Sequence, residues 1–158
     1  MAALAAVIAW FHIFFAICWL GSALFFAVVL GPVISSLSPQ SRGELLLSSM
    51  KRIEVFELVV STMTVLFGVL LVFSLQEFSL FIIFGATFGI TAYLIGLAGM
   101  TPLTRSITRL LKMLQNEPQN FKLINQLANT NKKFRITSII ELVFMLLAVS
   151  SMVAAGFL

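Results

Sequence analysis

Charged side chains are scarce in this sequence. Only 10% of its 158 residues are Asp, Glu, Lys or Arg, whereas 60% are hydrophobic. A water-soluble domain carries about 25% charged residues, so this chain has too few to cover a surface that faces water. The scarcity excludes a soluble globular protein and predicts one that lies in a lipid bilayer.

The residues that build common catalytic and metal centres are also rare. The chain has one histidine (His12), one cysteine (Cys18) and no aspartate. A hydrolytic triad or a four-ligand zinc site cannot be assembled from this set, and a single cysteine forms no intrachain disulfide. The sequence also contains no glycine-rich phosphate loop. Any catalysis would therefore be that of a bound cofactor.

Long uncharged runs are abundant instead. A helix needs about 20 apolar residues to cross the hydrocarbon core of a bilayer, and four runs between charged residues provide this length. We predict an all-α, four-helix transmembrane bundle that forms a single domain over residues 1–158. The predicted spans are about 3–30, 56–76, 79–101 and 137–157, the first ending at Gly31-Pro32 and the third near Thr101-Pro102.

The basic residues indicate the orientation of these spans. All ten Lys and Arg fall within 42–52 and 105–135, whereas both termini and the tight turn expected near Gln76-Glu77 have none. Because Lys and Arg gather in cytoplasmic loops, we expect a multi-pass protein of the prokaryotic cytoplasmic membrane with both termini extracytoplasmic. The net charge of +4 is thus assigned to membrane topology and not to nucleic acid. The expected partners are the lipid bilayer and other membrane subunits or a second copy of the chain.

The cytoplasmic connections are expected to be partly helical. Ser38-Pro39-Gln40 is typical of a helix start, and Asn116-Glu117-Pro118 is typical of a break, with a second short helix expected over 119–129. Between them, apolar residues recur at helical spacing over 103–114, with basic residues interleaved. Either the third span continues into the cytoplasm, or this amphipathic segment rests on the lipid surface or a partner.

The two halves of the chain resemble each other weakly. Lys51-Arg52 precedes Phe56-Glu57-Leu58-Val59, and Lys132-Lys133 precedes Ile140-Glu141-Leu142-Val143. A duplicated helical hairpin would give this pattern, as would chance. We expect Glu57 and Glu141 to form interfacial ion pairs with Arg52 or Arg135. A role in proton entry is the alternative.

His12 is the candidate site residue. An ionisable group inside a span is costly and therefore suggests a function, and histidine is a common ligand of metals and of haem. The alternative is a neutral imidazole that is hydrogen-bonded to a neighbouring helix. Trp19 lies seven residues on, which returns it to the same helix face. Small residues nearby allow a close helix approach or leave room for a flat cofactor.

Met152 is the candidate second ligand. Counted from the span midpoints, it lies at about the depth of His12 and of Gly85. A thioether there would give His/Met ligation of haem, although methionine also commonly fills apolar gaps. Soft thioethers suit Cu(I) as well, so copper binding by His12 with Met152, Met63 or Met145 is an alternative.

Several short motifs carry a family resemblance. Phe11-His12-Ile13, Trp19-Leu20-Gly21-Ser22, Phe25-Phe26 and Gly31-Pro32 resemble the first helix of the copper-resistance protein D family, whose relatives include the bacterial membrane-bound protoporphyrinogen oxidase. The likeness extends to Leu37-Ser38-Pro39, Lys51-Arg52, Phe67-Gly68-Val69-Leu70, Thr101-Pro102-Leu103 and Lys133-Phe134-Arg135-Ile136.

This resemblance implies a four-helix membrane bundle that binds haem b or handles copper. It matches His12 to the family's first-helix histidine, a haem-ligand candidate. One feature departs from the oxidase branch, whose members carry a lysine in the third span: residues 81–100 contain no basic residue. That departure puts the oxidase activity in doubt.

Three hypotheses follow from these patterns. The first is a haem b-binding membrane protein that passes electrons, as a subunit of a respiratory or oxidase complex. The second is a copper-transporting or copper-handling membrane protein. The third is a cofactor-free structural subunit of a larger membrane complex.

Overall fold

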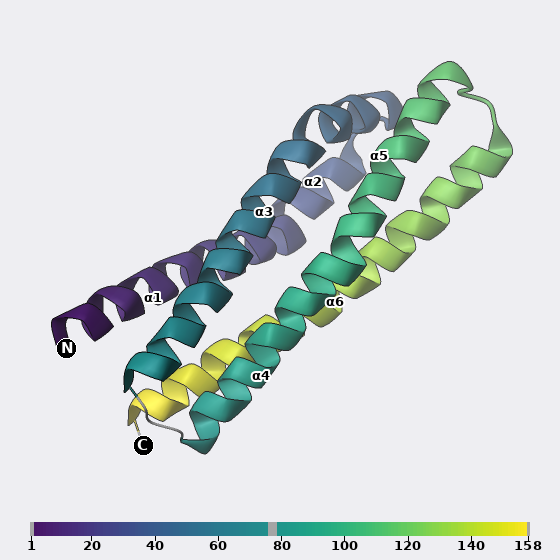
Figure 1. Ribbon diagram of the computed structural model, residues 1–158. Helices are drawn as coiled ribbons and strands as arrows, with labels where there is room; N and C mark the ends of the chain where they lie inside the picture. The colour runs from purple at the N-terminus through teal and green to yellow at the C-terminus, as the bar shows by residue number, and fades with distance from the viewer. Residues whose placement is uncertain (1, 76–78, 158) are drawn as a thin grey trace.

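The computed structural model describes residues 2–75 and 79–157 and is helical almost throughout. Within that part of the chain, four helical rods are long and apolar enough to cross a membrane, which confirms the predicted four-helix bundle. The rods alternate in direction, so that the N- and C-termini lie at the same end of the bundle (Figure 1). The tight turn predicted near Gln76-Glu77 lies outside the described residues.

Each half of the chain forms a hairpin of two rods. In the first rod of each half, a short π-helical segment joins two α-helices, whereas the second rod is one uninterrupted α-helix. The first hairpin consists of α1 (Ala2–Phe25), η1 (Phe26–Leu30), α2 (Gly31–Ser36) and α3 (Pro39–Leu75). The second consists of α4 (Leu80–Ile95), η2 (Gly96–Met100), α5 (Thr101–Asn116) and α6 (Phe121–Phe157).

The sequence suggested that the first and third helices end near their prolines, but both helices continue past them. Pro32 and Pro102 lack an N–H, and a proline ring inside an α-helix clashes with the carbonyl four residues earlier. Each rod accommodates its proline with a π-turn that ends two residues before it. The Gly31 N–H bonds to the Phe26 carbonyl, and the Thr101 N–H bonds to the Gly96 carbonyl, each five residues back. The helix therefore continues past both prolines.

The two long connections between spans, which the sequence predicted to be partly helical, are extensions of the same rods. The α3 helix begins at Pro39, as predicted, and the Ser38 hydroxyl accepts a hydrogen bond of 3.2 Å from the Ser41 N–H. The third rod continues through the amphipathic segment to Asn116, which favours the continuing helix over a separate surface helix. The short helix expected over 119–129 is instead the start of α6 at Phe121. A helix of 37 residues is about 55 Å long, so these rods extend well beyond a hydrocarbon core of about 30 Å.

The two hairpins have the same construction. The α1 helix packs along α3, and α4 packs along α6. Both π-turns are five residues long and stand directly before a residue–proline pair, and α3 and α6 are each 37 residues long. These shared features favour the duplicated-hairpin interpretation over chance.

The core of the bundle receives one side chain from each rod. The buried residues Trp19, Val60, Ala92 and Met145 pack together, and they come from α1, α3, α4 and α6. Most other apolar side chains face outward, as expected for helices that are surrounded by lipid. Because lipid tails are as apolar as leucine, helices in a membrane associate through close packing and not through the hydrophobic effect.

The two tryptophans provide a matched test of this core. Trp19 is 5% exposed and Trp10 is 59% exposed. We expect Trp19→Ala to destabilise the bundle by about 3 kcal/mol, because it leaves a large cavity between the four rods. Trp10→Ala removes an outward-facing ring and should change the stability far less. Reversible unfolding in mixed detergent micelles measures both variants, and equal losses would contradict the placement of Trp19 at the centre.

Candidate functional site

His12 joins the two helices of the first hairpin. Its Nδ1 lies 2.8 Å from the backbone carbonyl oxygen of Thr64, across the α1–α3 interface. A carbonyl oxygen only accepts hydrogen bonds, so Nδ1 must carry the proton that it donates. In the neutral ring, the lone pair is then on Nε2. The contact thus fixes both the orientation of the ring and the nitrogen that is available to a ligand.

A glycine makes this close contact possible. A β-carbon built on Gly68 would lie 2.9 Å from Cε1 and 3.1 Å from Nδ1 of His12. The imidazole therefore lies directly against the backbone of α3. Three rings hold the helices together beside it: Phe67 stacks on Phe11 with centroids 5.0 Å apart and on Phe15 with centroids 5.9 Å apart.

Trp19 faces the interior, as its seven-residue spacing from His12 predicts, and it belongs to the central core. Cys18 and Tyr93 are partly buried beside that core. The Tyr93 hydroxyl lies 3.3 Å from the Thr62 hydroxyl, so the polar tip of Tyr93 joins α4 to α3. The structure therefore gives Trp19 and Tyr93 packing and bridging roles at the centre of the bundle.

Met152 belongs to the other hairpin. A β-carbon on Gly85 would lie 2.8 Å from Cε and 3.0 Å from the sulfur of Met152. The thioether of α6 thus rests on the backbone of α4, at the shared depth that the span midpoints predicted for Met152 and Gly85. His12 is anchored to α3 within the first hairpin, whereas Met152 is packed on α4 within the second.

The other two candidate methionines, Met145 and Met63, are packed among the helices as well. Met145 is a buried member of the central core, and Met63 is half-buried on α3. Among residues 2–75 and 79–157, no three His, Cys, Asp or Glu side chains are grouped so that they could hold a metal ion. A metal-bearing group at this site would therefore depend on His12.

The ion pairs expected for Glu57 and Glu141 do not form. The structure describes both carboxylates as well as Arg52 and Arg135, and it contains none of these pairs. The Glu141 carboxylate instead turns inward to the π-turn η2, where its Oε1 would lie 2.8 Å from a β-carbon on Gly96. Glu57 lies beside the Ser22 hydroxyl of α1. Helical spacing explains the error, because Arg52 precedes Glu57 by five residues and Arg135 precedes Glu141 by six, so neither arginine is a neighbour on the helix surface.

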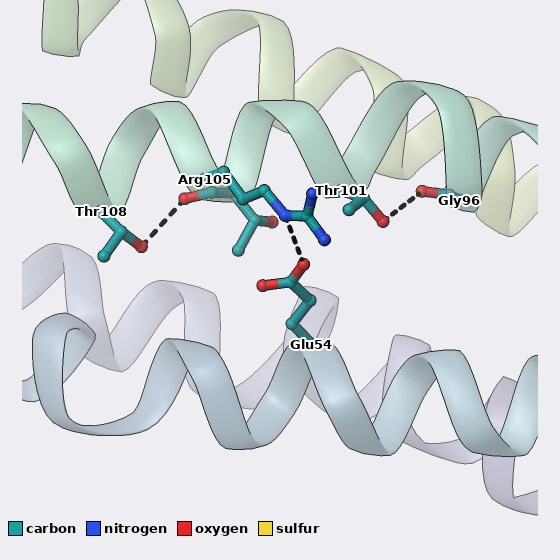
Figure 2. A network of polar contacts seen from close by, with 6 residues as sticks. Glu54, Gly96, Thr101, Arg105 and Thr108 are labelled. Carbon is teal, nitrogen blue, oxygen red and sulfur yellow. Dashed lines mark hydrogen bonds and ion pairs between the residues drawn. The ribbon is translucent and has the colours of Figure 1, made fainter.

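Sequence analysis missed the ion pair that does form. Arg105 Nε on α5 donates a hydrogen bond of 3.0 Å to Glu54 Oε1 on α3, as Figure 2 shows. The residues are 51 positions apart, and no local spacing rule links them.

The glycine contacts provide a second test. In Gly68→Ala, the new methyl group would meet the rigid imidazole of His12, so we expect a loss of about 1–3 kcal/mol from overpacking. In Gly85→Ala, the methyl group meets the flexible end of Met152, which can move aside, so the loss should be smaller. Gly21→Ala has no heavy atom within 4 Å of the new carbon and is the matched control. Thermal unfolding in detergent ranks the three variants, and a neutral Gly68→Ala would contradict the close contact of α1 and α3.

No family model, curated protein or solved structure matches this chain. The likeness to the copper-resistance protein D family therefore rests on the short motifs quoted above.

Proposed function

We propose that this multi-pass membrane protein binds haem b through His12 and transfers electrons as part of a membrane assembly. The observation that supports the proposal is the 2.8 Å contact between His12 Nδ1 and the Thr64 carbonyl oxygen. Histidines that bind metals almost always donate their other ring N–H to a carbonyl or carboxylate, which fixes the tautomer and makes the ligating nitrogen more basic. His12 has this arrangement.

The surroundings of His12 fit such a ligand. The ring cannot rotate freely, because it lies against the backbone at Gly68 and is hydrogen-bonded to Thr64. The adjacent stack of Phe11, Phe15 and Phe67 supplies the flat apolar surface that suits a porphyrin. When bound, a haem supplies one-electron chemistry, and the protein sets its potential through the axial ligand and the apolar surroundings.

Trp19 and Met152 are assigned supporting roles in this proposal. Trp19 packs the bundle centre and would form the floor of a cofactor site on the same face of α1 as His12. Met152 rests on Gly85 and would act by packing. We therefore expect Met152→Leu to leave the haem spectrum unchanged, since leucine fills a similar volume. A shift of the reduced α-band in this variant would instead make the thioether an axial ligand.

The orientation proposed is that both termini are extracytoplasmic, which places His12 nearer the extracytoplasmic face. It is supported by the ten basic residues of the two segments at the opposite end from the termini. In a Cys18→Ala background, Ser79→Cys should react with a membrane-impermeant maleimide added to intact cells, because Ser79 precedes α4 at the end that carries the termini. Asn116→Cys should react only after the cells are opened, and the reverse pattern would refute the orientation.

The optical spectrum of the purified protein tests the haem proposal directly. We expect a Soret band in the wild type, its loss in His12→Ala, and its retention in Cys18→Ala, which changes another side chain of α1 that makes no ligand contact in the proposal. Circular dichroism and gel filtration check that His12→Ala still folds. A folded wild type that shows no Soret band after expression with added haem would overturn the proposal. Copper measured in the same sample would then support the metal-handling alternative.

A further inference from the structure

A groove lies between α3 and α5, near the ends of the spans farthest from the termini. It has a volume of about 690 Å³. Its walls are two helix faces, each with the spacing of three and four residues that places side chains in a row. The lining residues are Lys51, Glu54, Val55 and Leu58 from α3, and Arg105, Thr108, Arg109, Lys112, Met113 and Asn116 from α5.

The packing of α5 determines which of its faces lines the groove. Thr104, Ile107 and Leu110 form the buried face of this helix, and α5 packs against α6. The amphipathic segment thus uses its apolar stripe inside the protein and not on a lipid surface. The basic residues Arg105, Arg109 and Lys112 are consequently directed away from the buried stripe, into the groove beside α3.

The ion pair between Arg105 and Glu54 orients the guanidinium group. Glu54 engages Nε at 3.0 Å, and within the described chain the two terminal amino groups of Arg105 make no hydrogen bond. Figure 2 shows Arg105 reaching from α5 toward Glu54 on α3. The Arg105 side chain is 73% exposed and Glu54 is 21% exposed, so the cation faces outward. A guanidinium with a free pair of donors is well suited to an oxyanion such as a phosphate.

The groove is basic overall and also has an apolar part. Four cations, Lys51, Arg105, Arg109 and Lys112, outnumber the single carboxylate. Val55 and Leu58 are half exposed and lie at the predicted start of the second span. Cations at headgroup level, next to exposed apolar side chains at acyl-chain level, complement the two parts of an anionic phospholipid. Basic pockets between membrane helices bind anionic headgroups for this reason.

We propose that this groove binds an anionic phospholipid. Arg105 and Arg109 contact its phosphate, Lys51 and Lys112 contribute to the positive field, and an acyl chain lies along Val55 and Leu58. The site is independent of His12 and of any cofactor. It would link α3 of the first hairpin to α5 of the second through one lipid molecule.

Lipid binding to the full-length protein in detergent tests this proposal. Native mass spectrometry compares phosphatidylglycerol with phosphatidylcholine, and we expect the wild type to prefer phosphatidylglycerol by about tenfold or more, since each basic residue near an anionic surface adds attraction. The variant Arg105→Gln/Arg109→Gln/Lys112→Gln should lose this preference. The control Lys122→Gln/Lys132→Gln/Lys133→Gln removes the same charge from exposed positions on α6 and should keep it.

A further variant and a competition measurement complete the lipid-binding test. The variant Arg109→Gln/Lys112→Gln leaves the Arg105–Glu54 ion pair intact, so it separates loss of binding from loss of folding and should bind phosphatidylglycerol several-fold more weakly. Glycerol 3-phosphate at millimolar concentration should not displace the lipid. An equal loss in the α6 control, no loss in the groove variants, or full displacement by glycerol 3-phosphate would each overturn the proposal.

Discussion

A backbone N–H or C=O group inside a bilayer has no water to bond to, so each must find a partner within the protein. This constraint dictates the long uninterrupted helices and explains how the two inner prolines are tolerated. A proline removes one helical donor and displaces one acceptor. The π-turns at 26–30 and 96–100 accommodate the altered hydrogen bonding within five residues. In each turn, the N–H of Gly31 or Thr101 bonds to the carbonyl five residues back. The rods can therefore continue, and α5 arises as the direct extension of a membrane span.

Close packing has to supply the association that the hydrophobic effect cannot supply in lipid. The structure achieves it where a large side chain on one helix meets a glycine on the next. His12 lies on Gly68, Met152 lies on Gly85, and Glu141 lies on Gly96. In the first of these contacts the same approach brings an imidazole nitrogen to a backbone carbonyl. The contact that packs the two helices of the first hairpin is thus the same contact that orients the imidazole of the candidate ligand.

Hydropathy and charge were sufficient to predict the four spans, because both depend on composition along the chain. The start of α3 at Pro39 and the break after Asn116 were also predictable, since each has a local signature. A hydrogen bond from His12 to a neighbouring helix was one of the two interpretations offered and is confirmed, but its partner atom was not predicted. The partner of His12 is a backbone carbonyl, which every residue possesses and which leaves no mark in the sequence. Glu54 and Arg105 meet only because α5 continues past Pro102, and that continuation depends on a π-turn that hydropathy does not reveal.

Comparison of the two hairpins separates the requirements of the fold from the candidates for function. Both halves have a π-turn before a proline, a glutamate near the middle of the second helix, and a glycine that receives a large side chain from the paired helix. Features that occur twice are explained by the hairpin itself. His12 has no counterpart in the second hairpin, where Met152 and Glu141 of the second helix lie on Gly85 and Gly96 of the first rod. The basic face of α5 has none in the first, where α2 ends after six residues without a cation. The two similar hairpins therefore differ at two places, the candidate ligand in one half and the basic groove wall in the other, and neither feature is explained by the construction that the hairpins share.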